Sequence, residues 1–506
     1  MNNELLSKRL SGILLHPTSL PGPYGIGDLG SQAYKFIDIL AKSKQSLWSI
    51  LPLGPTFKED FHCPYSSYSG FAGNIFLISP EKLYKEGLIS RADLNIYTKS
   101  VASKNKSRIN YTKLEPAKAK LLRLAYQNSI KKDGDLIEGF LHKHPWARDF
   151  ASFTALRKKI NKTRKSWDVD LRTKNPKRIK NLLSQLSEEV RFEIFCQHLF
   201  FKQWAELRSY AHSKNVYICG DLPIYMADDS ADVWAHPEYF QLDRKTGLAK
   251  LVSGVPPDSF SKTGQLWNHP IYNWSEMEKD HFGWWVDRMK TLFGLVDYLR
   301  IDHFRGFVAY WGVQGNSKTA EHGMWMTCPG EKLFHTLQKK LGDLPIVVED
   351  LGVITPDVED LRDRFGFMGM KILQMGFDSS GPLSESPYVP INFLPNYVVY
   401  TGTHDNNTSL GWYESLPQRH KRRLMQYLGI EGKKELTWSF IRLAQSSVAR
   451  WSIIPVQDIM HLGREARINH PGTADWKNWT WRMADNISSP KLEKLRELTE
   501  TYQRAF

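Results

Sequence analysis

Three apolar runs of this sequence end in carboxylic acids. They read VDYLRIDHFRGF (296–307), IVVEDLG (346–352) and NYVVYTGTHDN (396–406), and they carry Asp302, Glu349 and Asp405 near the ends of predicted strands. Retaining chemistry at a glycosidic bond needs one ionised carboxylate as nucleophile and one carboxyl group as acid and base. The residue types and their positions therefore favour chemistry on sugars.

The first run also places an arginine beside its acid. Side chains alternate along a strand, so Arg300 and Asp302 point to the same side. The positive charge lowers the pKa of the carboxyl group and keeps it ionised, as a nucleophile requires. A structural salt bridge at a strand end is the alternative interpretation, because such pairs also perturb pKa values.

The second run ends in two acids in sequence, Glu349 and Asp350. Glu349 has the longer side chain and more reach, and neighbouring anions should raise its pKa. Asp350 points to the other side of a regular strand, so we expect it to be structural.

Eight strand-like runs, most of them separated by helical sequence, predict a (β/α)8 TIM barrel. The runs are 11–20, 46–55, 216–227, 296–307, 346–352, 370–377, 397–403 and 451–460. Active sites of such barrels lie at the carboxyl ends of the strands, so the three acids are expected to converge on one mouth.

The second and third runs are separated by a long segment that is mostly helical in pattern. A structureless loop of this length is implausible inside a compact domain, so a large, mostly helical insertion is predicted. The predicted division is 1–55 for the first part of the barrel, 56–215 for the inserted subdomain and 216–506 for the rest of the barrel.

Two loops could contact a sugar. Residues 63–74, CPYSSYSGFAGN, are rich in hydroxyl groups and glycine, which suits either hydrogen bonds to sugar hydroxyls or a simple turn. Residues 251–274 contain paired prolines and small polar residues, and they predict a long loop that carries Trp267.

The charge of the chain is concentrated in one segment. Residues 99–190 hold 23 Lys and Arg against 9 Asp and Glu, which accounts for the whole net charge of +14. An anionic partner such as nucleic acid is one interpretation, and a solvated helical face is the other. The second is favoured because no nucleic-acid motif accompanies the charge, so no nucleic-acid partner is expected.

The remaining composition is that of a soluble globular protein. Hydrophobic residues make up 41% of the chain, and the 17 Trp and 21 Tyr include rings suited to stacking on sugar faces. Cys63, Cys196, Cys219 and Cys328 are widely spaced and predict neither a metal site nor a disulfide framework. The chain shows no signal peptide and no apolar stretch of roughly 20 residues, so a cytoplasmic protein without membrane contact is expected.

The motifs RIDHFRG, VVEDLG and TGTHDN together resemble the 4-α-glucanotransferases called amylomaltases or disproportionating enzymes, within the α-amylase clan. Further matches run from His16 to about Arg482. The resemblance implies Asp302 as nucleophile, Glu349 as acid and base, and Asp405 as a third acid that grips the sugar hydroxyls.

The same resemblance implies a set of sugar contacts. His303 and His404 would hydrogen-bond the sugar ring that Asp405 holds, and Trp267 would stack on glucan. Asp221 in GDLPIYMA supports the active site, with a helix or turn cap as the alternative. The remaining implied substrate-binding residues are Arg300, Tyr65, Ser67, Tyr68 and Asn469.

Two stretches depart from the pattern of that family. Gly-Asn-Pro would be expected after Trp267, and this chain has Asn268, His269 and Pro270. Near the C-terminus, His470 and residues 475–477 also differ. These departures concern loop shape and acceptor preference, and they leave the three acids intact.

The reaction predicted in this way is transfer between maltooligosaccharides and other α-1,4-glucans through a covalent intermediate. An α-amylase-like hydrolase is the alternative enzyme, and it would increase the total number of reducing ends. A catalytically silent glucan-binding protein is the third possibility, which the presence of all three acids disfavours. No cofactor or metal is implied, because the sequence has no P-loop and no dinucleotide fingerprint.

Overall fold

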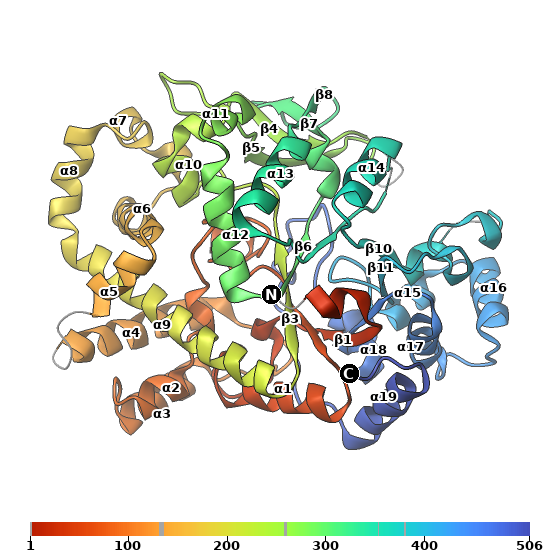
Figure 1. Cartoon of the computed structure of the whole chain (residues 1–506). Coiled ribbons are helices and arrows are strands. Elements are labelled where there is room, and N and C mark those ends of the chain that lie inside the picture. Colours follow the sequence, from red (N-terminus) through yellow and green to blue (C-terminus); the bar gives the residue numbers. More distant parts are fainter. Residues whose placement is uncertain (1–2, 131–135, 258–260, 353, 379–380) are drawn as a thin grey trace.

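Eight parallel strands form the centre of the molecule (Figure 1). The computed structural model describes the chain except for residues 1–2, 131–135, 258–260, 353 and 379–380. The strands are β1 (Leu10–Leu14), β2 (Leu47–Ser49), β3 (Tyr217–Leu222), β6 (Tyr298–Ile301), β9 (Ile346–Val348), β10 (Gly369–Ile372), β11 (Tyr397–Tyr400) and β12 (Trp451–Pro455). Each falls within or at the edge of one predicted run, which confirms the barrel.

The sheet closes on itself at a narrow seam. Its order is β10-β11-β12-β1-β2-β3-β6-β9, and a parallel bridge between Val347 and Met368 joins the two end strands. Across the seam, the Val348 N–H donates to the Met368 carbonyl at 2.8 Å, and the Met368 N–H donates to the Ile346 carbonyl at 3.4 Å. The barrel is therefore complete, with the seam as its weakest junction.

Several strands are shorter than their predicted runs. The run 451–460 divides at Pro455 into β12 and the helix α18 (Val456–Met460), and 370–377 becomes β10 followed by a 3₁₀ turn at Leu373–Gly376. Apolar runs do not distinguish a buried strand from a buried helical turn, so the pattern overestimated strand length.

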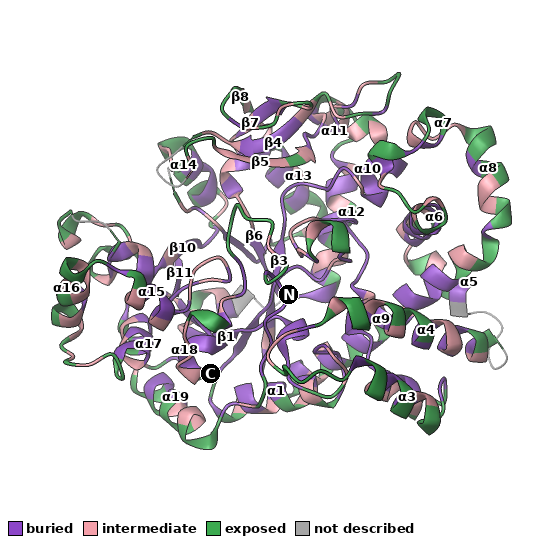
Figure 2. Ribbon diagram, turned by 180° about the vertical axis from the view of Figure 1, so that it is seen from behind, coloured by how far each residue is buried: buried purple, intermediate pink, exposed green. Residues whose placement is uncertain are grey.

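Helices surround the barrel and cover its outer face. Figure 2 shows the strands buried, while the surrounding helices carry exposed residues on their outer sides. In α1 (Ser31–Lys42), Ala33, Phe36, Ile37 and Leu40 are buried, at the 3.6-residue period of an amphipathic helix. The other covering helices are α12 (Gly283–Leu295), α13 (Gly330–Leu341), α14 (Pro356–Arg364), α15 (Ser409–Ser415), α16 (Gln418–Leu428), α17 (Leu436–Ser446) and α19 (Ser489–Thr501).

The segment between β2 and β3 is mostly helical, as predicted. It contains α2 (Pro80–Lys85), α3 (Arg91–Val101), α4 (Tyr111–Ile130), α5 (Leu136–Lys143), α6 (Trp146–Ile160), α7 (Val169–Arg172), α8 (Pro176–Gln185) and α9 (Ser187–Ser213). The long helix α9 joins the main core, where Trp204 is buried and its Nε1 donates to the Leu295 carbonyl at 2.8 Å. The division at residues 56 and 215 into separate units stays a prediction.

The region 251–274 is not the long loop that its composition predicted. It forms β4 (Leu251–Val255) and β5 (Gln265–Pro270), followed by the start of α11 (Trp274–Lys279). These strands belong to a four-stranded antiparallel sheet in the order β5-β4-β7-β8, with β7 (Ala309–Gln314) and β8 (Gly323–Thr327). We call it the rim sheet. β4 pairs with its sequence neighbour β5 on one side and with β7, much later in the chain, on the other. Local composition could not reveal this second pairing.

In the part of the chain that the structure describes, no helix is long and apolar enough to cross a membrane.

Candidate active site

The barrel brings the three predicted acids to the carboxyl ends of their strands. Asp302 directly follows β6, Glu349 directly follows β9, and Asp405 lies in the loop after β11. The Glu349 N–H donates to the Ile301 carbonyl at 2.9 Å, and the Asp302 N–H donates to the Leu222 carbonyl at 3.0 Å. These bonds extend the strand pairing into the site and fix the positions of both acids.

Arg300 in β6 connects the carboxylates of neighbouring strands. Its guanidinium group lies 2.7 Å from Asp221 Oδ1 and 2.8 Å from Asp221 Oδ2, and a second nitrogen lies 2.9 Å from Asp302 Oδ1. Asp221 is part of β3 and does not cap a helix. Burial raises the pKa of Asp221, and Arg300 opposes that effect. The arginine thus compensates one buried carboxylate and one half-buried carboxylate at once.

Glu349 is held in a different environment. Its Oε2 accepts the His303 backbone N–H at 2.7 Å. Burial, together with the nearby negative charge of Asp302, raises the pKa of Glu349 to about 8. The carboxyl group is therefore protonated at neutral pH, next to an aspartate that is paired with arginine.

His303 turns the chain between the two acids. Its backbone has φ 52°, in the left-handed region, and this turn presents its N–H to Glu349. Its ring lies edge-on to Trp267, with ring centroids 4.8 Å apart, and burial lowers the pKa of the imidazole to about 4. A neutral His303 donates a hydrogen bond from one ring nitrogen and accepts one at the other.

Asp405 has several partners. Asn469 Nδ2 donates to its Oδ1 at 2.6 Å, and His404 Nε2 lies 3.4 Å from its Oδ2. Burial alone would raise the pKa of Asp405, but His404 and Asn469 hold it well below the usual range. Asp405 and Glu349 thus sit in environments that push their pKa values in opposite directions, so the two carboxyl groups hold different protonation states.

Aromatic rings form one wall of the site. The Tyr65 hydroxyl donates to Asp221 Oδ2 at 2.7 Å, and its ring stacks on His404 with centroids 4.8 Å apart. The Trp479 ring lies 5.8 Å from that of Tyr65 and 5.9 Å from that of His404. Trp267, on the rim sheet, lies over His303.

Ser67 and Tyr68 have other partners. The Tyr68 hydroxyl donates to Asp60 at 2.5 Å, and the Ser67 hydroxyl donates to the Ser69 carbonyl at 3.2 Å. Both side chains are buried. Among the described residues of that loop, Tyr65 is the predicted contact that reaches the residues around the acids. A sugar contact by Ser67 or Tyr68 stays a prediction.

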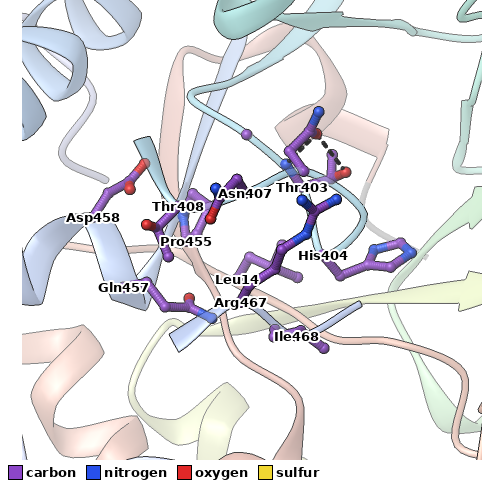
Figure 3. A pocket seen from close by; sticks show the side chains of 12 residues that line it. Leu14, Thr403, His404, Asn407, Thr408, Pro455, Gln457, Asp458, Arg467 and Ile468 are labelled. Atoms are coloured by element: carbon purple, nitrogen blue, oxygen red, sulfur yellow. Dashed lines mark hydrogen bonds between the residues drawn. The ribbon is translucent and has the colours of Figure 1, made fainter. Parts of the chain in front are cut away.

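Sequence reasoning missed Arg467 and Trp479. Arg467 donates to the Asp405 carbonyl at 2.8 Å and to the Asn469 carbonyl at 2.6 Å, so it anchors the loop that carries the third acid. It also lines a small pocket with His404 and Thr403 beside that loop (Figure 3). There, the Thr403 N–H and hydroxyl both donate to Asn406 Oδ1 at 2.9 Å. Asn469 lies two residues after Arg467 and was predicted to bind sugar, so its neighbours in the sequence could have been considered as well.

The departure after Trp267 has a structural counterpart. Asn268 occupies the place where glycine was expected, and its φ is 61°. Asparagine tolerates this left-handed conformation better than most residues, so the strand keeps its bend without glycine.

Comparison with known proteins places these observations in a family. Residues 15–488 match the family model described as 4-alpha-glucanotransferase. A Synechocystis protein named 4-alpha-glucanotransferase is 44% identical over 99% of both chains, and one from Clostridium butyricum is 44% identical over 97% of this chain and 100% of its own.

A solved structure agrees in fold over the whole chain. The amylomaltase from Streptococcus agalactiae, in complex with acarbose, has a TM-score of 0.94 and 37% sequence identity, covering 99% of this chain and 100% of its own. Full-length sequence matches, the family model and the barrel with acids at its strand ends agree. This chain therefore belongs to the 4-alpha-glucanotransferase family.

Proposed function

We propose that this protein is a retaining 4-α-glucanotransferase that moves α-1,4-glucan segments between maltooligosaccharides through a covalent intermediate. The observation that carries the proposal is the pairing of Asp302 with Arg300, beside a Glu349 whose pKa is raised to about 8. Family membership and the acarbose complex of the Streptococcus agalactiae relative support α-glucans as the substrate class.

In the first half-reaction, Asp302 attacks the anomeric carbon of the donor glucan. Glu349 gives its proton to the departing glycosidic oxygen, which leaves with the reducing-end fragment. The result is a glycosyl ester on Asp302 and an ionised Glu349. Asp405 grips the hydroxyls of the same sugar and stabilises the positive charge that develops on the ring.

In the second half-reaction, the 4-hydroxyl of another glucan attacks the ester carbon. Glu349 takes the proton of that hydroxyl, and the Asp302 carboxylate leaves with net retention of configuration. Each cycle breaks one α-1,4 bond and forms one, so the total number of reducing ends stays constant.

The surrounding side chains position the sugar. His303 and His404 donate hydrogen bonds to its hydroxyls, while Trp267 and Tyr65 offer ring faces to the glucan. Trp267 belongs to the rim sheet, which gives the acceptor side a hydrogen-bonded support. Exclusion of water by such a support favours transfer over hydrolysis.

The first experiment is incubation of the purified protein with maltotriose alone, with products resolved by chain length. We expect glucose together with a ladder of longer maltooligosaccharides, at constant total reducing ends. Rising reducing ends with only shorter products would assign the protein as a hydrolase. No reaction would leave a glucan-binding protein.

The covalent step is tested at Asp302. A 5-fluoro-α-glucosyl fluoride loses its anomeric fluoride to the nucleophile and forms an ester that hydrolyses slowly. It should label the wild-type protein with one 5-fluoroglucosyl unit, and peptide mass spectrometry should find that unit on Asp302. Asp302→Asn should reduce transfer at least about 10³-fold, equivalent to roughly 4 kcal/mol of barrier. A label on another residue, or near-normal activity of the variant, would refute the assignment.

A further inference from the structure

A second cavity of ≈ 410 Å³ lies between parts of the chain that are remote in sequence. Its walls are the loop 22–25 after β1, residues 98–110 at the end of α3 and the start of α4, and residues 482–484 near the C-terminus. None of the three acids or their direct partners lines it. Its volume lies within the range of small-molecule sites.

Two arginines of the wall are bound to neutral groups. Arg482 is buried and donates to the Leu20 and Gly22 carbonyls at 3.1 and 2.9 Å. Arg108 donates to the Lys477 and Glu465 carbonyls at 3.1 and 2.5 Å. Neither has a carboxylate within salt-bridge distance among the described residues.

A third cation and a helix end add to this charge. Lys106 lines the cavity, is exposed, and has no partner among the described residues. Asn110, also in the lining, precedes α4, and its Oδ1 accepts the Lys113 N–H at 3.2 Å, while the first turn holds no acidic residue. The N–H groups of Tyr111 and Thr112 precede this bond and have no intrahelical partner, and such groups carry partial positive charge that attracts anions.

Nearby acids reduce the positive potential of the cavity, but their side chains do not line it. The charges of Asp475 and Glu465 act on Arg108, and that of Asp28 acts on Arg482. Asp28 itself is buried and accepts the Gly30 N–H at 2.7 Å. No acidic side chain lines the cavity, so its inner surface presents cations, amides and hydroxyls.

We propose that this cavity binds a phosphate monoester, with the phosphate group between Lys106, Arg108 and the start of α4. The cavity is larger than a phosphate ion needs, and Thr98, Ser103 and Asn105 line the rest of it. Their hydroxyl and amide groups suit the hydroxyls of a hexose, so the fitting ligand is a phosphorylated sugar. The basic character of residues 99–190 thus has a binding role in at least this part of the segment.

The test is calorimetric titration of the full-length protein at low ionic strength with glucose 6-phosphate, inorganic phosphate and glucose. We expect glucose 6-phosphate to bind more tightly than inorganic phosphate, and glucose to give no binding that depends on this cavity. Equal affinity for the two phosphates would refute the sugar part of the proposal, and no binding of either would refute the whole.

Three variants test whether glucose 6-phosphate binds in this cavity. Lys106→Glu should weaken glucose 6-phosphate binding at least about tenfold, because it reverses a charge beside the phosphate. Lys104→Glu is the matched control, since Lys104 is exposed on the same segment and does not line the cavity. Ser103→Trp adds bulk without charge and should also abolish binding.

All three variants should keep wild-type transfer from maltotriose, because none touches the acids. Equal loss of affinity in Lys106→Glu and Lys104→Glu would show a diffuse surface field in place of a site. Unchanged binding in Ser103→Trp would place the ligand elsewhere. These outcomes do not depend on the proposed transferase activity, which the maltotriose assay tests separately.

Discussion

Glu349 and Asp405 show how one site can hold two carboxyl groups in different protonation states. Glu349 accepts a single backbone N–H and faces the charge of Asp302, whereas Asp405 is bound by Asn469 and lies beside His404. Hydrogen-bond donors and positive charge favour an ionised carboxylate, and burial beside an anion favours a neutral one. Residue identity alone does not assign these roles.

The raised pKa of Glu349 makes a prediction about pH dependence. The proposed first half-reaction needs the protonated form, which predominates below the pKa, so kcat/KM should fall as pH rises through about 8. Initial rates of glucose release from maltotriose between pH 5 and pH 10 measure this basic limb.

Glu349→Gln is the variant that checks the assignment. It should lower kcat about 10²- to 10⁴-fold and remove the basic limb from the residual activity. A basic limb retained in Glu349→Gln would assign the titration to another group.

At the level of elements, the rim sheet shows how a distant segment can support a proposed substrate contact, that of Trp267. Trp267 lies on β5, which pairs with β4, and β4 pairs in turn with β7 from the segment after β6. The sheet therefore ties Trp267 to the same part of the chain that carries Asp302 and His303.

Trp267→Ala tests the stacking role. Loss of a ring against the glucan should cost about 1.4 kcal/mol, which is a tenfold fall in kcat/KM for maltotriose, and should increase the share of water as acceptor. Product analysis by chain length, with reducing ends counted, gives both values. Trp325→Ala on β8 is the matched control, since its ring is 44% exposed on the same sheet. A similar fall in both variants would assign the effect to damage of the sheet.

The rim sheet also marks the limit of reasoning from the sequence. The barrel strands could be predicted because each is a compact apolar run with a local signal, and the acids could be found because they end such runs. The pairing of β4 with β7 depends on residues remote in sequence, so paired prolines and small residues indicated a loop instead. The role of Arg467 could not be predicted for a related reason, because its partner Asp405 lies far away in the chain.

The whole molecule is held together where the C-terminus returns to the barrel. Arg504 is fully buried, and its guanidinium group donates to the carbonyls of Leu10, Gln445, Ser447, Ala449 and Arg450. These carbonyls belong to the start of β1, to the last turn of α17 and to the segment between α17 and β12. One side chain therefore closes the base of the barrel.

Arg504→Ala should lower the free energy of unfolding by about 3 kcal/mol, because it leaves several buried carbonyls without donors. The midpoint of guanidinium-induced unfolding and the Tm measure the change. Arg496→Ala on α19 is the control, since Arg496 pairs with Glu500 at the surface and its loss should leave the Tm unchanged. Equal stability of the two variants would contradict the role given to Arg504.

The seam between β9 and β10 has a consequence for local opening of the barrel. Thermal opening begins where neighbouring strands share the fewest hydrogen bonds, and here that is the Val347–Met368 bridge. Glu349 lies on the β6 side of this opening, fastened by bonds to Ile301, His303 and Phe304. A fluctuation that parts the barrel wall at this bridge should therefore leave the spacing of Asp302 and Glu349 unchanged, because these bonds tie the two residues together on the same side of it.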